Sequence, residues 1–272
     1  MFLADYHTHS HFSPDGRASM EDMAAAAAAR GIKQLCFTDH VDNCCMGDPV
    51  SPPELGDAKK LPAMRQELAA AKAALGDKIE LRLGMELASP NHDPAAAAEI
   101  AELEGLDFII GSIHNLRGMD DFYFMKYESE AQCRELVEKY CLEYIEIANL
   151  GLCSVLGHLG YTQRYMSRSG FRIDLMDYAD LLESIFRIII PKGIGIEINT
   201  SGLRDNTGHT FPPASILELY RQCGGEIITV GSDAHTPRDA GAGIQDAYLL
   251  MQSLGFRYVC AFSHKEPEFI QL

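Results

Sequence analysis

The stretch Asp5-Tyr6-His7-Thr8-His9-Ser10 follows a short apolar run, Met1–Ala4, at the start of the chain. Side chains in an extended strand repeat every two residues, so His7 and His9 face the same side of the backbone. Two neutral imidazoles on one side suit a pair of ligands on one zinc or iron ion. A single His-x-His pattern also arises by chance, so the metal interpretation depends on the rest of the chain.

Apolar runs of strand length alternate with helical patterns along the chain. We expect strands at Phe2–Ala4, Gln34–Phe37, Ile79–Leu83, Phe108–Ile110, Ser154–Leu156, Ile194–Ile198 and Ile227–Val230, with Tyr258–Phe262 as an edge or closing strand. We expect helices at Ser19–Arg30, Pro53–Leu75, Pro94–Glu104, Glu128–Leu150, Asp174–Lys192, Pro213–Cys223 and Pro237–Leu254. Strands that alternate with such helices indicate parallel βαβ units, and about seven units in one domain favour a barrel over an open sheet.

Each of the expected strands before Tyr258 is followed by side chains that can bind a metal. In chain order these side chains are His7 and His9, Asp39 and His40, Glu86, His114, His158, Glu197 and Asn199, and Asp233 and His235. Parallel barrel strands end on one rim, where the active sites of such folds lie, so we expect convergence on one cavity. Independent capping or packing explains single histidines but not this series. His92, His209 and His264 fall outside the pattern, and His11 fits it only if the first strand continues that far.

The mixture of imidazoles and carboxylates predicts the kind of ion. Several imidazoles with a few carboxylates fit two or three zinc, iron or manganese ions, whereas magnesium alone prefers oxygen ligands. Glu86, arriving from a middle strand, is the natural bridge between two ions. Paired ions lower the pKa of a shared water and bind the attacking and leaving oxygens, which suits the hydrolysis of phosphate esters and of amides.

Two arginines near the same rim favour a phosphate ester. Arg164 follows His158, and Arg204 follows the sixth expected strand, both in expected loops. A guanidinium binds phosphate oxygens through two hydrogen bonds, although a surface salt bridge explains either arginine alone equally well. The presence of both on one metal-rich rim favours the phosphate ester.

Composition limits the classes of partner. The 272 residues carry a formal net charge of -16, which argues against binding of a nucleic acid polymer but not of a small anionic substrate. The sequence contains no apolar run of membrane-spanning length and no signal-peptide pattern, so we expect a cytoplasmic protein without membrane association. The 8 cysteines show no C-x-x-C spacing, and we expect free thiols, with Cys44-Cys45 as a weaker metal-ligand candidate.

Several motifs together resemble the polymerase and histidinol phosphatase superfamily, PHP. The matching stretches are Asp5–Ser10, Phe37–His40, Gly84–Glu86, Gly111–His114, Gly157-His158 and Gly231–His235. Within the superfamily the chain is similar to the histidinol-phosphate phosphatases at Glu197–Arg204, at the His158–Arg164 loop, and at Gly255–Val259 with Lys265–Pro267. The resemblance implies a distorted (β/α)7 TIM-like barrel, with the metal site at the C-terminal ends of the strands. It also implies a single PHP-type metal-dependent phosphoesterase domain over residues 1–272.

The resemblance divides the ligands among up to three ions. The first ion would be held by His7, His9, Glu86 and Asp233. The second would be held by Glu86, as a bridge, with His114 and His158. The third would be held by Asp15, His40 and His235. Many relatives have histidine where this chain has Asp15, in Ser13-Pro14-Asp15-Gly16, and the harder anionic ligand leaves the occupancy and identity of the third ion open.

The implied reaction is hydrolysis of L-histidinol phosphate to L-histidinol and phosphate, in histidine biosynthesis. Arg164 and Arg204, with the metals, would stabilise charge on the phosphate oxygens. Asp39 is a candidate acid for the leaving alkoxide, and a role in orienting a ligand is equally open. The loops Val41–Lys60 and Arg117–Phe124 are expected to shape the pocket for the imidazole end, with Arg117 as a further substrate-binding candidate.

Two alternatives are also compatible with the sequence. The first is another phosphoesterase on the same scaffold, acting on nucleotides, oligonucleotide ends or phosphotyrosine. The second is a non-catalytic metal-binding domain, which predicts missing ligands, whereas every expected strand end here carries a competent residue. The sequence leaves the native metal and the oligomeric state open.

Overall fold

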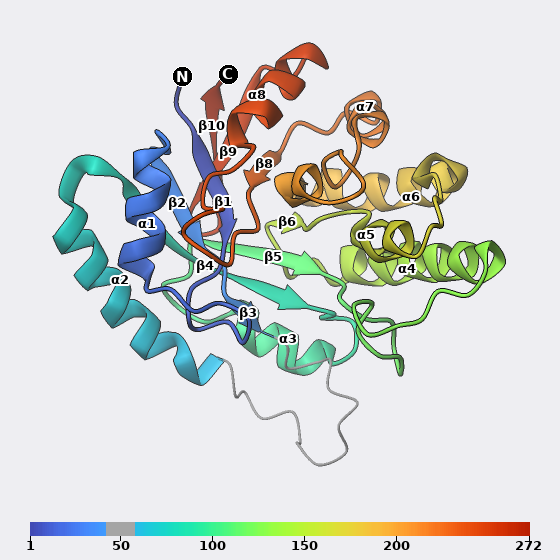
Figure 1. The fold of residues 1–272 in the computed structure, drawn as a ribbon, viewed down its shortest axis with the longest axis horizontal. Coiled ribbons are helices and arrows are strands. Elements are labelled where there is room, and N and C mark those ends of the chain that lie inside the picture. Colours follow the sequence, from blue (N-terminus) through green and yellow to red (C-terminus); the bar gives the residue numbers. More distant parts are fainter. Residues whose placement is uncertain (42–57) are drawn as a thin grey trace.

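A parallel sheet of eight strands forms the centre of the structure, a computed structural model that describes residues 1–41 and 58–272 (Figure 1). The strands follow the order β1-β2-β4-β5-β6-β7-β8, and β3 continues the line of β2 along β4. Their bounds are β1 (Ala4–Thr8), β2 (Gln34–Phe37), β3 (His40–Val41), β4 (Glu80–Ala88), β5 (Phe108–Ser112), β6 (Val155–Leu156), β7 (Gly195–Asn199) and β8 (Ile228–Gly231).

The sheet curves until its two edges meet. The amide of Asp233, just after β8, donates to the carbonyl of His7 in β1 at 2.7 Å, and the amide of His9 donates to the carbonyl of Ala234 at 2.9 Å. Such contacts between the first and last strands make a nearly closed barrel, so the predicted fold is confirmed.

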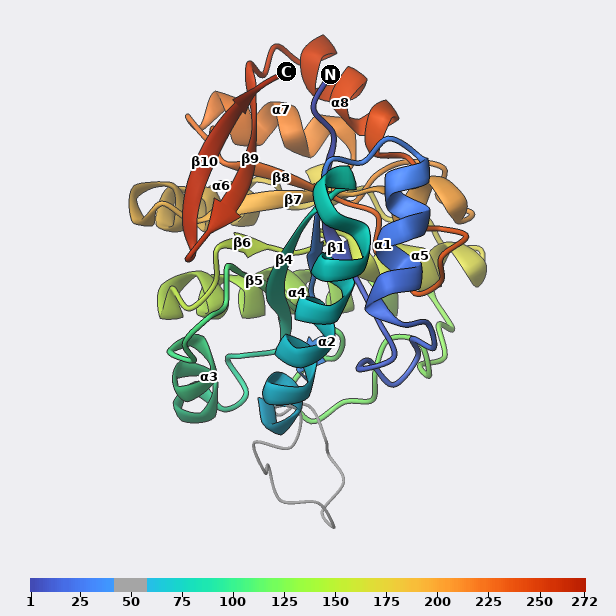
Figure 2. The same cartoon turned by 90° about the vertical axis from the view of Figure 1, so that its left-hand side faces the viewer.

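Helices surround the outside of this barrel (Figures 1 and 2). They are α1 (Met20–Ala29), α2 (Leu61–Leu75), α3 (Pro94–Ala101), α4 (Glu130–Leu150), α5 (Tyr161–Arg168), α6 (Ala179–Ile189), α7 (Ala214–Gln222) and α8 (Ile244–Ser253). Short 3-10 helices occupy Ala58–Lys60, Gly76–Lys78, Leu175–Tyr178, Ile190–Lys192 and Thr200–Arg204. Within the described part of the chain, no helix has both the length and the apolar character needed to cross a bilayer.

Local sequence signals fix several of these helix ends. The Ser19 side chain accepts from the amide of Asp22 at 3.1 Å and begins α1, and Ser129 begins α4 in the same way. Gly151 ends α4 with φ of 70°, a left-handed conformation that glycine adopts without strain. The expected helix from Pro237 instead begins at Ile244 as α8.

Two predictions about the elements need correction. The stretch Tyr258–Phe262 is neither an edge strand nor a closing strand of the barrel sheet, because β9 (Tyr258–Ser263) pairs antiparallel with β10 (Glu266–Gln271) in a separate two-stranded sheet. The loop expected around Arg164 is the helix α5 (Tyr161–Arg168), which begins after Gly160 with φ of 106°. The expectations for Cys44-Cys45 and for most of the loop Val41–Lys60 lie outside the described residues.

The β9–β10 hairpin closes the amino-terminal end of the barrel. Tyr6 of β1 and Phe108 of β5 meet edge to face at 5.1 Å, and because β2 and β4 separate their strands, this contact crosses the barrel interior. Phe262 of β9 packs on Phe108 at 5.0 Å, and its amide donates to the Tyr6 hydroxyl at 2.8 Å. This end is therefore filled by side chains, and the polar residues gather at the opposite, carboxyl-terminal end.

Candidate metal centre

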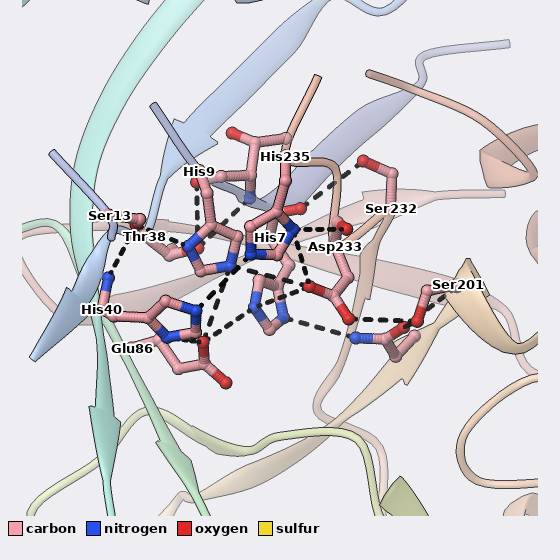
Figure 3. Close-up of polar contacts among 12 residues, drawn as sticks. His7, His9, Ser13, Thr38, His40, Glu86, Ser201, Ser232, Asp233 and His235 are labelled. Carbon is pink, nitrogen blue, oxygen red and sulfur yellow. Dashed lines mark hydrogen bonds and ion pairs between the residues drawn. The ribbon is translucent and has the colours of Figure 1, made fainter. Parts of the chain in front are cut away.

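The predicted metal ligands converge at the carboxyl-terminal ends of the barrel strands. Figure 3 shows six of them, His7, His9, His40, Glu86, Asp233 and His235. Three groups of side chains bring one ligand atom each to within 4.8 Å of one another among the described residues. These groups are His7 with His9 and Asp233, His40 with Glu86 and His114, and His9 with His40 and His235. Residues more than 200 positions apart in the chain thus face one small volume.

The ligands expected for a first ion surround one oxygen of Glu86. Its Oε2 lies 3.3 Å from Nε2 of His7 and 3.6 Å from Nε2 of His9. Oδ1 of Asp233 lies 3.8 Å and 3.7 Å from the same two nitrogens. The geometry therefore agrees with one cation shared by these four side chains.

The other carboxylate oxygen of Glu86 faces the expected second group. Oε1 lies 2.7 Å from Nε2 of His158 and 3.1 Å from Nε2 of His114, and the two nitrogens are 3.4 Å apart. One carboxylate thus presents a different oxygen to each group, as expected of a bridge between two ions.

The third group lies at the mouth of the site. His235 and His40 approach each other with Nε2 atoms 3.5 Å apart, and Asp15 lies 3.1 Å from His235 and 3.6 Å from His40. The side chain of Asp15 is 60% exposed, whereas the ring of His9, stacked on that of His235 at 4.0 Å, is buried. The aspartate therefore occupies a position from which it can complete a third group, next to the first.

The residues of the first group fit a bound cation. Nε2 of His7, Nε2 of His9 and Oε2 of Glu86 are buried and make no hydrogen bond of good geometry among residues 1–41 and 58–272, although Nδ1 of His40 lies 2.8 Å from that Glu86 oxygen. Buried polar atoms normally have a partner, and atoms of this kind that face one another are satisfied together by a metal ion. The set of imidazoles and carboxylates is the donor chemistry of zinc, iron and manganese.

Electrostatics in the cluster keep the carboxylates anionic. Burial raises the pKa of Glu86, but the facing rings of His114, His7 and His40 outweigh burial and hold that pKa well below its usual range. Burial also raises the pKa of Asp233, but neighbouring positive groups, of which His7 has the largest effect, outweigh burial and lower that pKa below its usual value. Anionic carboxylates among imidazoles favour a divalent cation over a neutral ligand.

Two of the histidines form hydrogen bonds through Nδ1, the ring nitrogen that does not face the cluster. Nδ1 of His7 lies 2.6 Å from Oε1 of Glu197, so this strand-end glutamate contacts a predicted ligand at the ring nitrogen that does not face the cluster. Nδ1 of His9 lies 3.0 Å from Oγ of Ser13. Both contacts leave Nε2 directed into the cluster, where it is available to a metal.

Asp39 is engaged with neighbouring serines. Its Oδ1 accepts from the amide of Ser10 and from Oγ of Ser13, both at 2.7 Å, and its Oδ2 accepts from Oγ of Ser10 at 2.8 Å. Burial raises the pKa of Asp39, and hydrogen bonds from Ser13 and Ser10 oppose that shift. The structure thus connects Asp39 through Ser13 to His9, a connection that no sequence pattern indicated, because a turn brings these residues together.

The three predicted arginines differ in their relation to the cluster. Arg164 hydrogen-bonds Ser201, lies 3.5 Å from Oδ2 of Asp233 and stacks over the ring of Tyr161 at 5.2 Å. Arg204, in the 3-10 turn that ends at this residue, donates to the carbonyl of Ser232 at 2.7 Å. Both guanidinium groups therefore lie beside the Asp233 segment.

Arg117 points elsewhere. Its side chain is 53% exposed and donates to the carbonyl of Asn91 at 2.7 Å and to Glu146 at 3.1 Å. Of the histidines outside the predicted pattern, His92 binds Glu143 at 2.8 Å, and the ambiguous His11 binds Glu67 at 2.7 Å. None of these contacts involves the cluster of predicted metal ligands.

Tyr161 was not predicted from the sequence. Its ring lies 4.7 Å from that of His158 and 5.2 Å from that of His114, and its hydroxyl contacts that of Tyr165 at 2.7 Å. A tyrosine at the start of a short helix carries no distinguishing pattern, so only the folded structure places it against the second group of ligands.

A parallel barrel with imidazoles and carboxylates at the carboxyl ends of its strands defines the class of metal-dependent barrel hydrolases. Residues 5–201 match the family model of the PHP domain. The chain belongs to the PHP domain family.

Relatives within this class agree in length and fold. The histidinol-phosphatase of Lactococcus lactis is 29% identical over 264 residues, which cover 95% of this chain and 94% of that protein. A probable histidinol-phosphatase of Thermotoga maritima is 26% identical over 97% of both chains. A crystal structure of the Lactococcus lactis histidinol phosphate phosphatase, complexed with zinc, L-histidinol and phosphate, superposes with a TM-score of 0.80 at 26% identity and covers 98% of each chain.

Proposed function

We propose that this protein is a metal-dependent phosphatase that hydrolyses L-histidinol phosphate to L-histidinol and inorganic phosphate. The observation that carries the proposal is the bridging position of Glu86, with one oxygen toward His7 and His9 and the other toward His114 and His158. Similarity over nearly the full chain to a protein crystallised with zinc, L-histidinol and phosphate supports the choice of substrate.

The cofactors of the proposal are two or three divalent ions, zinc, iron or manganese. The first group is His7, His9, Glu86 and Asp233, the second is Glu86, His114 and His158, and the third is Asp15, His40 and His235. Divalent ions in such sites lower the pKa of a bound water and neutralise charge on phosphate oxygens. The exposed Asp15 makes the third group the most accessible to solvent, which favours exchange of its ion.

The chain's own residues bind and orient the phosphate ester. Arg164 is held by Ser201 and by the aromatic ring of Tyr161, so its guanidinium has a fixed direction beside Asp233. With Arg204 it presents donors to phosphate oxygens, which a planar guanidinium binds in pairs. This arrangement stabilises the negative charge on the phosphate as the ester bond breaks.

Asp39 acts in this proposal through His9. Both of its oxygens are occupied by Ser10 and Ser13, and Ser13 contacts Nδ1 of His9. Asp39 therefore orients a ligand rather than delivering a proton to the leaving alkoxide. The assignment of Arg117 to substrate binding stays a prediction, as do the single-domain organisation, the place in histidine biosynthesis and the cytoplasmic location.

The test of the proposed function is a metal analysis combined with a substrate panel. Protein purified without chelator is analysed for zinc, iron and manganese and is assayed on histidinol phosphate, nucleoside monophosphates and an aryl phosphate. We expect the highest kcat/KM on histidinol phosphate. A higher kcat/KM on a nucleotide would reassign the substrate. If metal-free protein gained no activity with zinc, iron or manganese, the result would favour the non-catalytic metal-binding domain over an enzyme.

A further inference from the structure

Glu197 of β7 is a buried carboxylate that touches both principal groups of ligands. Its side chain is 1% exposed. Oε1 lies 2.6 Å from Nδ1 of His7, and Oε2 accepts from the backbone amide of His158 at 2.8 Å and from Nδ2 of Asn199 at 3.3 Å. His7 belongs to the first group and His158 to the second, so one side chain holds a member of each.

The contact with His7 fixes which ring nitrogen carries the proton. A carboxylate can only accept hydrogen bonds, so Nδ1 of His7 is the donor in the contact with Glu197. The lone pair of Nε2 is then free for a metal, and Nε2 is the atom that faces Glu86 and Asp233. The contact with the amide of His158 fixes the backbone from which the second ring projects.

The neighbouring strand leaves space for this contact. A Cβ atom added at Gly231 of β8 would lie 2.3 Å from Cβ of His7 and 2.4 Å from Oε1 of Glu197. Such distances are far below van der Waals contact, so any larger residue at this position would push the two side chains apart. The absence of a side chain at Gly231 is what permits the short contact.

We infer that Glu197 is a positioning residue that couples the first metal group to the second. It holds the His7 ring in the metal-binding tautomer and at the same time anchors the backbone of His158. Loss of both contacts of this carboxylate therefore weakens both groups, and loss of one contact weakens the group on that side, although Glu197 itself is not a ligand in any of the converging groups among the described residues. This inference rests on the proposed metal-dependent function.

The Glu197→Gln variant tests the inference through its hydrogen-bonding capacity. Glutamine has nearly the same shape, but one side of its amide accepts and the other donates. If the oxygen faces the amide of His158, the NH2 group faces Nδ1 of His7 and favours the tautomer that carries its proton on Nε2. If the oxygen faces His7, the amide of His158 meets a donor. Either orientation disturbs one group of metal ligands.

The matched control is Asp107→Asn at the closed end of the barrel. Asp107 also uses its two oxygens on two separate backbone amides, those of Leu83 at 3.2 Å and His264 at 3.1 Å. The same change from carboxylate to amide therefore removes a similar structural link without touching a metal ligand. Glu197→Asp is a second variant that keeps both acceptors but shortens the side chain by about 1.5 Å, so it cannot reach His7 and His158 together.

The measurement is zinc binding by full-length protein, by elemental analysis and by competition with a chromogenic chelator. We expect Glu197→Gln to weaken zinc binding about 10- to 100-fold, and we expect Glu197→Asp to weaken it as well. Asp107→Asn should keep the wild-type zinc affinity while losing about as much unfolding free energy as Glu197→Gln. Wild-type zinc affinity in a folded Glu197→Gln or Glu197→Asp protein would overturn the inference. Because no substrate is used, failure of the protein to hydrolyse histidinol phosphate would refute the proposed substrate and leave this result intact.

Discussion

The role of Asp39 can be decided by Asp39→Asn, which removes its negative charge and its capacity to act as an acid. In the structure Oδ1 accepts from the amide of Ser10 and from Oγ of Ser13, and Oδ2 accepts from Oγ of Ser10. The oxygen of an asparagine can keep the first two bonds. Its NH2 group can donate to the Ser10 hydroxyl, which rotates to accept. The network that leads through Ser13 to His9 therefore survives the change.

The expected magnitude follows from these contacts. Hydrogen bonds to a charged group contribute about 1.5–3 kcal/mol each, compared with about 0.5–1.5 kcal/mol for neutral ones. Three weakened bonds suggest a loss of about 3 kcal/mol, and relief of a buried charge offsets part of it. With His9 still held, we expect kcat to fall less than about tenfold, whereas loss of a general acid lowers the rate about 10²- to 10⁴-fold.

The assay compares kcat on histidinol phosphate with kcat on an aryl phosphate. An aryl oxide leaves without help from an acid, so loss of an acid would slow only the alkyl ester. We expect Asp39→Asn to reduce both rates slightly and to the same extent. Ser13→Ala is the matched variant, because it breaks the connection to His9 while leaving the Asp39 carboxyl group, and we expect it to lower metal affinity. A loss above about 100-fold on histidinol phosphate alone would identify Asp39 as the acid and refute the orienting role.

Three further predictions concern the bridge, the arginines and the barrel interior. Glu86→Gln should lower metal content and reduce kcat more than about 100-fold, because both groups of ligands share this carboxylate; wild-type turnover with metals bound would disprove the bridge. Arg164→Ala should lower kcat/KM about 10- to 100-fold through loss of a charge-assisted hydrogen bond. Arg117→Ala should change kcat/KM less than about fivefold, because its ion pair is exposed. Steady-state kinetics with the same ester compares the two variants, and equal losses would assign Arg117 to substrate binding. Tyr6→Phe should lower the unfolding free energy by about 2 kcal/mol, which corresponds to a fall of about 5 °C in Tm by calorimetry. The variant should keep the wild-type kcat in the enzyme assay. An unaltered Tm would contradict the proposed closure of the barrel end.

Much of the site was accessible from the sequence because metal ligands are chemically distinctive. His7, Glu86 and His158 each follow or end a short apolar run, and parallel strands carry their ends to a single rim. Neither step needs knowledge of packing. The same reasoning could not assign Glu197, since a carboxylate at a strand end satisfies the pattern whether it faces a metal ion or a metal ligand.

The sequence by itself predicted the alternation of strands and helices, the nearly closed parallel barrel and the set of candidate metal-binding side chains. Only the tertiary structure shows which of these side chains face one another in the cluster and which contact the cluster from outside it. The distinction arises because Glu197 meets His7 across 190 positions of the chain, and Gly231 on a third strand leaves the space for that contact. Likewise, β9 has the apolar pattern of a barrel strand, but only its pairing with β10 and its contact with Tyr6 place it across the end of the barrel. Such choices depend on contacts between distant segments, which local patterns do not encode.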